Sequence, residues 1–300
     1  MKQYDVIILT DSRYLKDSDT DTYKHNVYYE DFILREQLAQ LGLRTKRLAW
    51  DDPYFNWGDT KSILFRSTWD YFDRFNEFSL WLEKVKRQTT LINSANIINW
   101  NLDKHYLSDL SVNGIHIPET KFIERKTSKS LRQLHEELGW SHTVLKPCVG
   151  GAARHTYEIN QDNLKSHEAI FSKLINEESM LLQPFQNSIK TKGEVSFMVM
   201  NSRFTHAILK IAKEGDFRVQ DDFGGSVHPY EANANEIKFA ENAVGACPEL
   251  PLYARVDVIE DNSGKLAVSE LELVEPELWF RYHPEAATEL ASGIKFHLNL

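Results

Sequence analysis

The chain has 300 residues, a formal net charge of −9, 42% hydrophobic residues and 12% aromatic residues, which is ample for a globular protein of two or three subdomains. The negative charge and the absence of a basic run argue against a nucleic-acid surface, and the unpaired spacing of Cys148 and Cys247 argues against a disulfide framework or a zinc site. Neither a signal peptide nor a run of about 18 apolar residues is present, so we expect a cytoplasmic protein without a membrane partner.

The N-terminal part predicts a β-α-β unit with a parallel sheet. The continuous apolar run from Tyr4 to Thr10 (YDVIILT) is typical of a strand buried on both faces. Periodicity adds a helix over residues 26–41 capped by Gly42, strands over 44–49 and 62–65, and a helix over 76–86. The sequence Thr10-Asp11-Ser12-Arg13 replaces the G-x-G-x-x-G fingerprint, so this is not the usual dinucleotide fold.

A candidate substrate site follows the third of these strands, in the segment RSTWDY. In an open sheet, ligands gather beyond the carboxyl ends of the strands, where Arg66, Trp69 and Asp70 would lie. Arg66 could pair with a carboxylate and Asp70 with an ammonium group, which suits an amino-acid-like zwitterion. The alternative for Trp69 is that it only fills a core.

A candidate phosphate-binding segment lies in the middle of the chain. A crossover over residues 91–101 and a helix near 103–110 precede a helix over 129–138 that Gly139 ends. A strand over 143–147 then brings Lys146 in front of Gly150 and Gly151, where small residues let backbone approach phosphate oxygens. The alternatives are a surface lysine at a strand end and an ordinary Gly-Gly turn.

The second half of the chain is dominated by strands. We expect strands over 180–185, 193–200 and 204–211, a helix over 235–244 with Asn235 as its N-cap and Gly245 as its stop, and a helix in the tail from 284 to 300.

The segment from Tyr253 to Phe280 predicts a β-hairpin, because two alternating runs flank the turn formers Asp261-Asn262-Ser263-Gly264. Alternation places Arg255 and Asp257 on one face with Glu270 and Glu272, and apolar residues on the other. Such a set of carboxylates could hold one or two hard cations, of which Mg²⁺ suits phosphate chemistry. The alternative is a half-exposed hairpin with a charged solvent face.

The order of these motifs resembles that of the ATP-grasp superfamily, in the branch of bacterial glutathione synthetase and the ribosomal-protein glutamate ligases. The phrases RSTWDY, LLQPF, GDFRVQDDFGG and ELELVEP are most similar to the ring-closing ligases of D-cycloserine biosynthesis and their uncharacterised relatives. The resemblance implies an α/β fold of α+β subdomains. These are a Rossmann-like pre-ATP-grasp substrate subdomain (1–95), a central subdomain with the phosphate loop (96–185) and a C-terminal subdomain with the metal site (186–300).

The resemblance also implies roles for individual residues. Those that match nucleotide-binding positions are Lys104 and Lys146 for the phosphates, Gly150 and Gly151 for the covering loop, Gln183 and Phe185 for the adenine hinge, and Glu194 for a ribose or hinge acid. Those that match metal and catalytic positions are Asp257, Glu270 and Glu272 for magnesium, Arg218 and Arg255 for the reacting phosphate and the tetrahedral intermediate, and Lys210 for an often basic position. Glutathione synthetase has asparagine at the third metal position, so Glu272 departs from its pattern.

The function implied is an ATP-dependent carboxylate–amine ligase that uses Mg²⁺ or Mn²⁺ and acts through an acylphosphate. Its substrate would be small and amino-acid-like or peptide-like, with the amine in the same or in a second molecule. We expect a monomer or homodimer with no nucleic-acid partner. The alternatives are a phosphotransferase that releases a stable phosphorylated product and a nucleotide-binding protein without chemistry.

Overall fold

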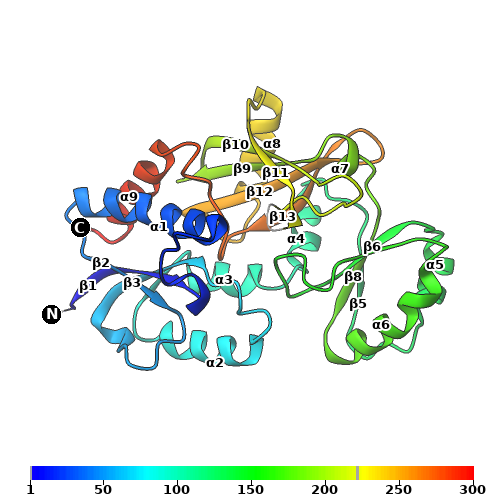
Figure 1. The fold of residues 1–300 in the computed structure, drawn as a ribbon, viewed down its shortest axis with the longest axis horizontal. Coiled ribbons are helices and arrows are strands. Elements are labelled where there is room, and N and C mark those ends of the chain that lie inside the picture. The colour runs from blue at the N-terminus through cyan, green and yellow to red at the C-terminus, as the bar shows by residue number, and fades with distance from the viewer. Residues whose placement is uncertain (1, 221–222) are drawn as a thin grey trace.

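The computed structural model describes residues 2–220 and 223–300, so Asp221 and Asp222 of the segment GDFRVQDDFGG lie outside the described residues. The chain is organised around three β-sheets (Figure 1), which use residues 4–92, 121–184 and 194–272. None of the described helices is both long enough and apolar enough to span a bilayer. The predicted α/β fold is therefore confirmed, while the subdomain limits stay a prediction.

The first sheet is parallel, as predicted, with the strand order β2-β1-β3-β4. Its elements are β1 (Tyr4–Thr10), η1 (Ser12–Tyr14), α1 (Thr22–Gln40), β2 (Thr45–Ala49), η2 (Trp57–Asp59), β3 (Thr60–Ser67), α2 (Phe75–Val85) and β4 (Thr90–Ile92). The central strand β1 pairs with β2 and with β3, and residues 6–9 are fully buried. Burial on both faces explains why this strand is a continuous apolar run.

The second sheet is antiparallel, with the order β5-β8-β6-β7. Its strands are β5 (Lys121–Ile123), β6 (Thr143–Pro147), β7 (Tyr157–Ile159) and β8 (Met180–Pro184), and α5 (Leu131–Leu138) and α6 (Leu164–Glu177) pack on it. Gly139 ends α5 in the left-handed conformation, as expected from its position. The predicted crossover over 91–101 includes a helix, α3 (Ala95–Asn101), and α4 (Tyr106–Val112) follows it.

The third sheet is also antiparallel, with the order β11-β10-β9-β12-β13. Its strands are β9 (Glu194–Met200), β10 (Arg203–Ile211), β11 (Ser226–Tyr230), β12 (Tyr253–Glu260) and β13 (Leu266–Glu272), and α7 (Ser188–Thr191) and α8 (Ala234–Gly245) accompany them. The predicted hairpin is β12–β13, in which Asp257 pairs with Glu270 and Arg255 with Glu272. Because β12 also pairs with β9 and is buried from Tyr253 to Ile259, the half-exposed hairpin is excluded.

The N-cap of α8 differs from the prediction. Asn233, not Asn235, accepts hydrogen bonds from the amides of Asn235 and Glu236, and the Glu236 carboxylate accepts one from the Asn233 amide. The N-cap of this reciprocal capping box therefore lies two residues before the N-cap predicted from the sequence.

The C-terminal helix α9 (Glu285–His297) returns to the start of the chain and lies beside α1 (Figure 1). Leu290 and Ile294 of α9 share one core with Ile8 of β1 and with Leu34 and Leu38 of α1. The N-terminal sheet and the C-terminal helix are therefore one packing unit, although the whole length of the chain separates them.

Candidate active site

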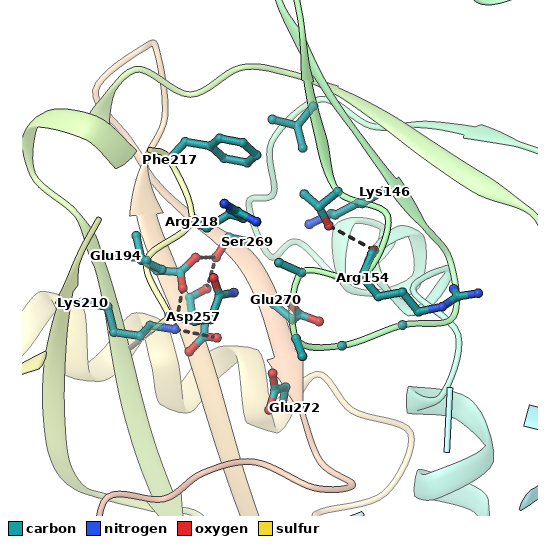
Figure 2. Close-up of a pocket in the computed structure, with 18 of the residues that line it drawn as sticks. Lys146, Arg154, Glu194, Lys210, Phe217, Arg218, Asp257, Ser269, Glu270 and Glu272 are labelled. Carbon is teal, nitrogen blue, oxygen red and sulfur yellow. Dashed lines mark hydrogen bonds and ion pairs between the residues drawn. The ribbon is translucent and has the colours of Figure 1, made fainter. Parts of the chain in front are cut away.

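A cleft of about 440 Å³ is lined by strand residues of the second and third sheets and, from the N-terminal part, by residues that follow β1 and β3 or lie in α1 (Figure 2). Every site residue predicted from the sequence lines this cleft except Arg66 and Asp70. The lining therefore includes Trp69, Lys104, Lys146, Gly150, Gly151, Gln183, Phe185, Glu194, Lys210, Arg218, Arg255, Asp257, Glu270 and Glu272. Residues spread over two hundred positions of sequence thus share one site.

Asp257 is the centre of a buried ion-pair network on β12. Its carboxylate accepts hydrogen bonds from Arg255 (Nη2–Oδ2, 2.8 Å) and from Ser196 (Oγ–Oδ1, 2.5 Å), and Lys210 Nζ lies 3.2 Å from Oδ2. Burial raises the pKa of Asp257, but the charges of Arg255 and Lys210 outweigh it and hold the pKa well below its usual range. Asp257 is therefore an anion in the folded protein.

Lys210 and one further cationic side chain, Arg218, are each held by a carboxylate other than Asp257 at this wall of the cleft. Lys210 Nζ lies 2.6 Å from Glu194 Oε1, and Ser269 donates a hydrogen bond of 2.7 Å to the other oxygen of Glu194. Arg218 pairs with Asp216 at 2.6 Å, and its guanidinium carbon lies 4.0 Å from the centre of the Phe223 ring. The basic side chains are thus held in place by carboxylates that face the same cleft or flank it.

Glu270 and Glu272 project into the cleft from β13 beside Asp257 (Figure 2). Lys104 Nζ lies 3.0 Å from Glu270 Oε1, and Glu272 forms an ion pair with Arg255. Burial lowers the stability of the charged form of Glu272, and repulsion from Glu270 and Asp257 adds to this, so its pKa rises to about 7. Three oxygen-donor side chains with mutual repulsion form the kind of site that a hard divalent cation stabilises.

Lys146 and the glycines after it form the opposite wall. Lys146 is half-buried, and burial together with the neighbouring Lys104 lowers its pKa below that of a surface lysine. A Cβ atom on Gly150 would lie 2.9 Å from Pro147 Cγ, and one on Gly151 would lie 3.0 Å from Phe72 Cε1. The plain surface-lysine alternative is therefore excluded, and the glycines let the loop approach its neighbours closely.

The predicted hinge is packed around the buried Phe185 ring. The Phe185 ring stacks on His142 at 4.3 Å between centroids and meets the Phe217 ring edge-on at 5.9 Å. The Phe185 amide donates to His142 O at 2.9 Å, and its carbonyl accepts from Asn262 Nδ2 at 2.8 Å. The backbone of Phe185 is thus engaged within the protein, and its side chain, only 3% exposed, is packed against His142 and Phe217 where the residue meets the cleft.

Arg66 and Asp70 lie outside the cleft, which differs from the sequence-based hypothesis. Arg66 is 3% exposed, pairs with Asp31 at 3.2 Å and donates to Pro276 O at 2.8 Å. Asp70 accepts from Trp50 Nε1 at 2.7 Å and pairs with Arg74. Arg66 points into the protein because β3 extends to Ser67, so this residue lies within a buried strand, while Asp70 is held in the turn after it by Trp50 and Arg74. Of the three residues in RSTWDY, only Trp69 reaches the cleft.

Sequence reasoning missed the other residues at this end of the cleft. They are Arg13, Tyr14, Tyr23, Glu275, Glu277 and Trp279. Tyr14 packs edge-on against Trp69 at 5.4 Å, and the Trp69 indole donates to Glu275 O at 2.9 Å. Burial, with repulsion from Glu272, raises the pKa of Glu275 to about 8. Glu275 was visible in the phrase ELELVEP, but it follows the end of the strand. Alternation therefore does not predict in which direction its side chain points.

Known proteins provide a comparison for this arrangement. Residues 6–93 match the family described as "D-cycloserine synthetase DcsG, N-terminal domain". The cycloserine biosynthesis protein DcsG of Streptomyces lavendulae is 26% identical over 294 residues, covering 92% of this chain and 96% of that protein.

Solved structures establish the same fold. A crystal structure of D-cycloserine synthetase DcsG superposes with a TM-score of 0.86 at 24% identity, covering 98% of this chain and 99% of that one. The D-alanine–D-alanine ligase of Bacillus anthracis complexed with ATP superposes with a TM-score of 0.66 at 13% identity, covering 99% and 97%. The ATP-grasp ligase PsnB with a precursor variant, Mg and ADP superposes with a TM-score of 0.64 at 14% identity, covering 99% and 100%.

The central and C-terminal parts of the chain determine its family. Residues 109–269, more than half of the 300, match the family described as "Prokaryotic glutathione synthetase, ATP-grasp domain". The match includes Lys146, the glycine loop, the hinge and Asp257 of β12, and it ends at residue 269, just before Glu270 and Glu272 of β13. The chain therefore belongs to the ATP-grasp ligases, in the family of the prokaryotic glutathione synthetases.

Proposed function

We propose that this protein is an ATP- and Mg²⁺-dependent ligase that joins a carboxylate to an amine through an acylphosphate, on a small amino-acid-like or peptide-like substrate. The observation that supports it is the convergence of Lys104, Lys146 and the glycine loop on one cleft with the carboxylates of β12 and β13. A protein that only bound nucleotide would gain nothing from three repelling carboxylates beside two cations. The proposed subdomain limits remain 1–95, 96–185 and 186–300, and the proposed location is cytoplasmic.

Asp257, Glu270 and Glu272 are the proposed magnesium ligands. Their donor atoms are all carboxylate oxygens, which Mg²⁺ prefers, and ATP-grasp enzymes use ATP with this metal. When bound, the metal neutralises phosphate charge during transfer. The Arg255 side chain bridges Asp257 and Glu272, and it keeps these two carboxylates oriented.

The nucleotide site is proposed along the two facing walls. Lys104 and Lys146 would contact the phosphates, and Gly150 and Gly151 would cover them, because unsubstituted backbone approaches phosphate oxygens closely. The Phe185 ring and the Gln183 segment would hold the adenine, and Glu194 would accept from the ribose. Lys104 already donates to Gly150 O at 2.5 Å, which ties the loop to the proposed phosphate site.

The chemistry needs a carboxylate oxygen converted into a leaving group. A substrate carboxylate oxygen attacks the γ-phosphorus of ATP, the bond to the β-phosphate oxygen breaks, and ADP leaves. The amine nitrogen then attacks the acyl carbon, loses a proton, and phosphate departs as the amide forms. Arg255, Arg218 and Lys210 are proposed to stabilise the transferring phosphoryl group and the oxyanion, since fixed cations in a cleft carry most of the catalysis in such transfers.

The substrate is proposed to lie at the end of the cleft formed by Trp69, Tyr14, Tyr23 and Glu275. Aromatic faces beside a carboxylate favour an ammonium group through cation–π attraction and ion pairing. The carboxylate to be activated would then point towards Arg255. Relatives named for D-cycloserine and for D-alanyl-D-alanine support a small amino-acid-derived substrate, with the amine in the same molecule or a second one.

Untargeted mass spectrometry tests the proposal. A pool of amino acids and their derivatives is incubated with the protein, ATP and Mg²⁺, and products are compared with those of the Glu270→Gln variant. A product lighter by one water than its reactant, or than two reactants together, is the expected result, with ADP formed in equal amount. A product that has gained phosphate would instead establish a phosphotransferase.

A further inference from the structure

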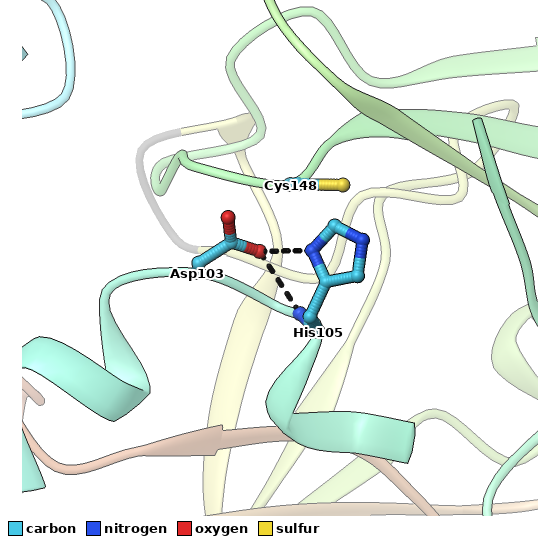
Figure 3. Close-up of side chains that lie close together, drawn as sticks. All are labelled: Asp103, His105 and Cys148. Carbon is cyan, nitrogen blue, oxygen red and sulfur yellow. Dashed lines mark hydrogen bonds and ion pairs between the residues drawn. The ribbon is translucent and has the colours of Figure 1, made fainter. Parts of the chain in front are cut away.

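Three potential metal-binding side chains lie together behind the phosphate loop, outside the cleft (Figure 3). One ligand atom each of Asp103, His105 and Cys148 lies within 4.8 Å of the others. None of the three lines the cleft, yet Asp103 and His105 flank Lys104, and Cys148 precedes Gly150 by two positions. This cluster is therefore separate from the carboxylates of β12 and β13, and it adjoins the proposed phosphate site.

We propose that Asp103, His105 and Cys148 form a binding site for a zinc-class divalent cation, which the spacing of the two cysteines did not predict because the donors come from two separate segments of the chain. A thiolate, an imidazole and a carboxylate are the donors that Zn²⁺ prefers, whereas Mg²⁺ prefers oxygen alone. Bonds of about 2.3 Å to sulfur and about 2.0 Å to nitrogen place such ligand atoms roughly 3.5 Å apart. To reach that geometry, the 2.6 Å between Asp103 Oδ1 and His105 Nδ1 has to lengthen and separations of up to 4.8 Å have to shorten, each by about 1 Å.

The imidazole of His105 is already oriented as in many metal sites. Its Nδ1 lies 2.6 Å from Asp103 Oδ1, and its Nε2 lies 3.1 Å from Glu124 Oε1. The ring also stacks on Phe122 at 4.3 Å between centroids. A ligating histidine usually donates its second ring N–H to a carboxylate, so one of the two acids can ligate while the other orients the ring.

The position of Cys148 is fixed by its backbone. Its amide donates to Ser179 O at 2.9 Å, its carbonyl accepts from the Lys104 amide at 2.8 Å, and the residue is 1% exposed. Burial raises the pKa of the thiol, so the metal must displace a proton when it binds. The Ser179 hydroxyl also donates to Glu124 at 3.1 Å, which brings a further carboxylate to the cluster.

The cluster is connected to the nucleotide site through Lys104. The Lys104 amide is bonded to the Cys148 carbonyl, and the Lys104 ammonium is bonded to Gly150 O. A cation bound by Asp103, His105 and Cys148 joins the segment around Lys104 to the segment that leads into the glycine loop. It would therefore restrict the movement of the loop that would cover the phosphates. We therefore expect that occupancy changes nucleotide affinity, reciprocally with the effect of nucleotide on metal affinity.

Cobalt(II) is the probe for this site. The protein is titrated anaerobically with Co²⁺ in excess Mg²⁺, which occupies the carboxylate site and leaves the thiol-containing one. We expect one equivalent to bind with thiolate-to-cobalt charge-transfer absorption in the near ultraviolet, and Zn²⁺ to abolish the absorption. Cys148→Ser should lose this band, whereas the matched control Cys247→Ser, whose sulfur lies by α8, should keep it.

A wild-type protein without the band, or a Cys148→Ser variant that retains it, overturns the proposal. His105→Gln provides the second variant, since its side chain is 39% exposed and its replacement leaves the buried packing intact. This variant should bind Co²⁺ at least tenfold more weakly while its circular dichroism is unchanged, and equal affinity overturns the proposal.

The coupling to nucleotide is tested by measuring ADP affinity calorimetrically with and without Zn²⁺. The affinity should change at least threefold with Zn²⁺ in the wild type but not in His105→Gln, and equal changes in these two proteins would contradict the coupling. None of these readouts requires turnover, so a wrong ligase assignment would leave them unaffected.

Discussion

The Lys104 ammonium lies 3.0 Å from the Glu270 carboxylate, and the same ammonium donates to Gly150 O in the glycine loop. The charge of Lys104 lowers the pKa of Glu270 despite its burial, and Lys146 adds to this effect. One cation therefore joins the strand that carries the proposed metal ligands to the loop that would cover the phosphates.

Replacing Glu270 with glutamine should separate nucleotide binding from turnover. The variant keeps the shape of the side chain but removes one negative charge from the proposed metal site, so we expect turnover to fall at least ~100-fold, the scale of losing one electrostatic group at a transferring phosphate. ADP binding without metal should remain or improve, because Lys104 loses its anionic partner. Calorimetry with ADP, with and without Mg²⁺, measures this. Glu136→Gln, on the exposed side of α5, is the control, and normal turnover in Glu270→Gln would remove the metal assignment.

Lys146→Ala should weaken ATP binding without destabilising the fold. Burial lowers the pKa of Lys146, which means that folding disfavours the charged form of this side chain. Removing the ammonium group therefore costs no folding free energy. A lost charge-assisted contact of about 1.5–3 kcal/mol corresponds to a 10- to 150-fold weaker ATP affinity. Thermal unfolding and calorimetry are compared with those of Lys165→Ala, an exposed lysine on α6. Unchanged affinity with a lowered melting temperature would show a structural role instead.

Arg66→Ala should act on stability, contrary to the sequence-based hypothesis of a substrate contact. Its guanidinium is buried between Asp31, the carbonyl of Pro276 and the Phe280 ring, whose centre lies 5.4 Å away. Removing one partner of a buried pair costs ~3 kcal/mol or more, even though Arg47 still pairs with Asp31. Denaturant unfolding measures the loss against Arg87→Ala, an exposed residue. An unchanged unfolding midpoint with a raised substrate KM would restore the earlier hypothesis.

Acid should destabilise the protein through His206. Burial, with the neighbouring His283, lowers the pKa of His206 to about 4, from about 6.5 in the unfolded chain. Because the unfolded state binds the extra proton first, this stability is complete above about pH 6.5 and is lost progressively as the pH falls towards 4. The shift corresponds to about 3 kcal/mol.

Equilibrium unfolding across this pH range provides the measurement for His206. His206→Gln should flatten the dependence, since a neutral side chain keeps a donor for Leu278 O, which His206 Nε2 contacts at 2.9 Å. His297→Gln, at an exposed position near the C-terminus, should leave the dependence unchanged. Parallel pH profiles for the wild type and His206→Gln would show that another group is responsible.

The sequence predicted those parts of the site in which alternation along a strand shows to which side a residue points. Strict alternation in RVDV and ELEL predicted that Arg255 and Asp257 share one side of their strand and that Glu270 and Glu272 share one side of theirs. The pairing of Asp257 with Glu270 and of Arg255 with Glu272 also depends on a register shift between Asp257 and Val258, which alternation does not reveal. Alternation did not predict Ser196 as a partner of Asp257, because the neighbour of a central strand is decided by sheet order. Arg66 was misplaced for a related reason: β3 continues to Ser67, two residues beyond the predicted strand end, so Arg66 lies within the buried strand and meets Asp31.

The fold was predicted less completely where elements are short. The three-residue strands β5 and β7 have no detectable period, and they are strands only because β8 and β6 pair with them. The N-cap of α8 was displaced by two residues because Asn233 and Asn235 are both good capping residues, and the reciprocal bond from Glu236 decides between them.

The packing of α9 against α1 and β1 has a consequence for how the protein is made. On the ribosome, β1 and α1 emerge hundreds of residues before the helix that completes their core, at a pace of roughly 5–20 residues per second. Ile8, Leu34 and Leu38 therefore wait for many seconds without Leu290 and Ile294. The nascent N-terminal unit exposes an apolar face throughout that interval, which makes it a natural client for chaperones that bind emerging chains.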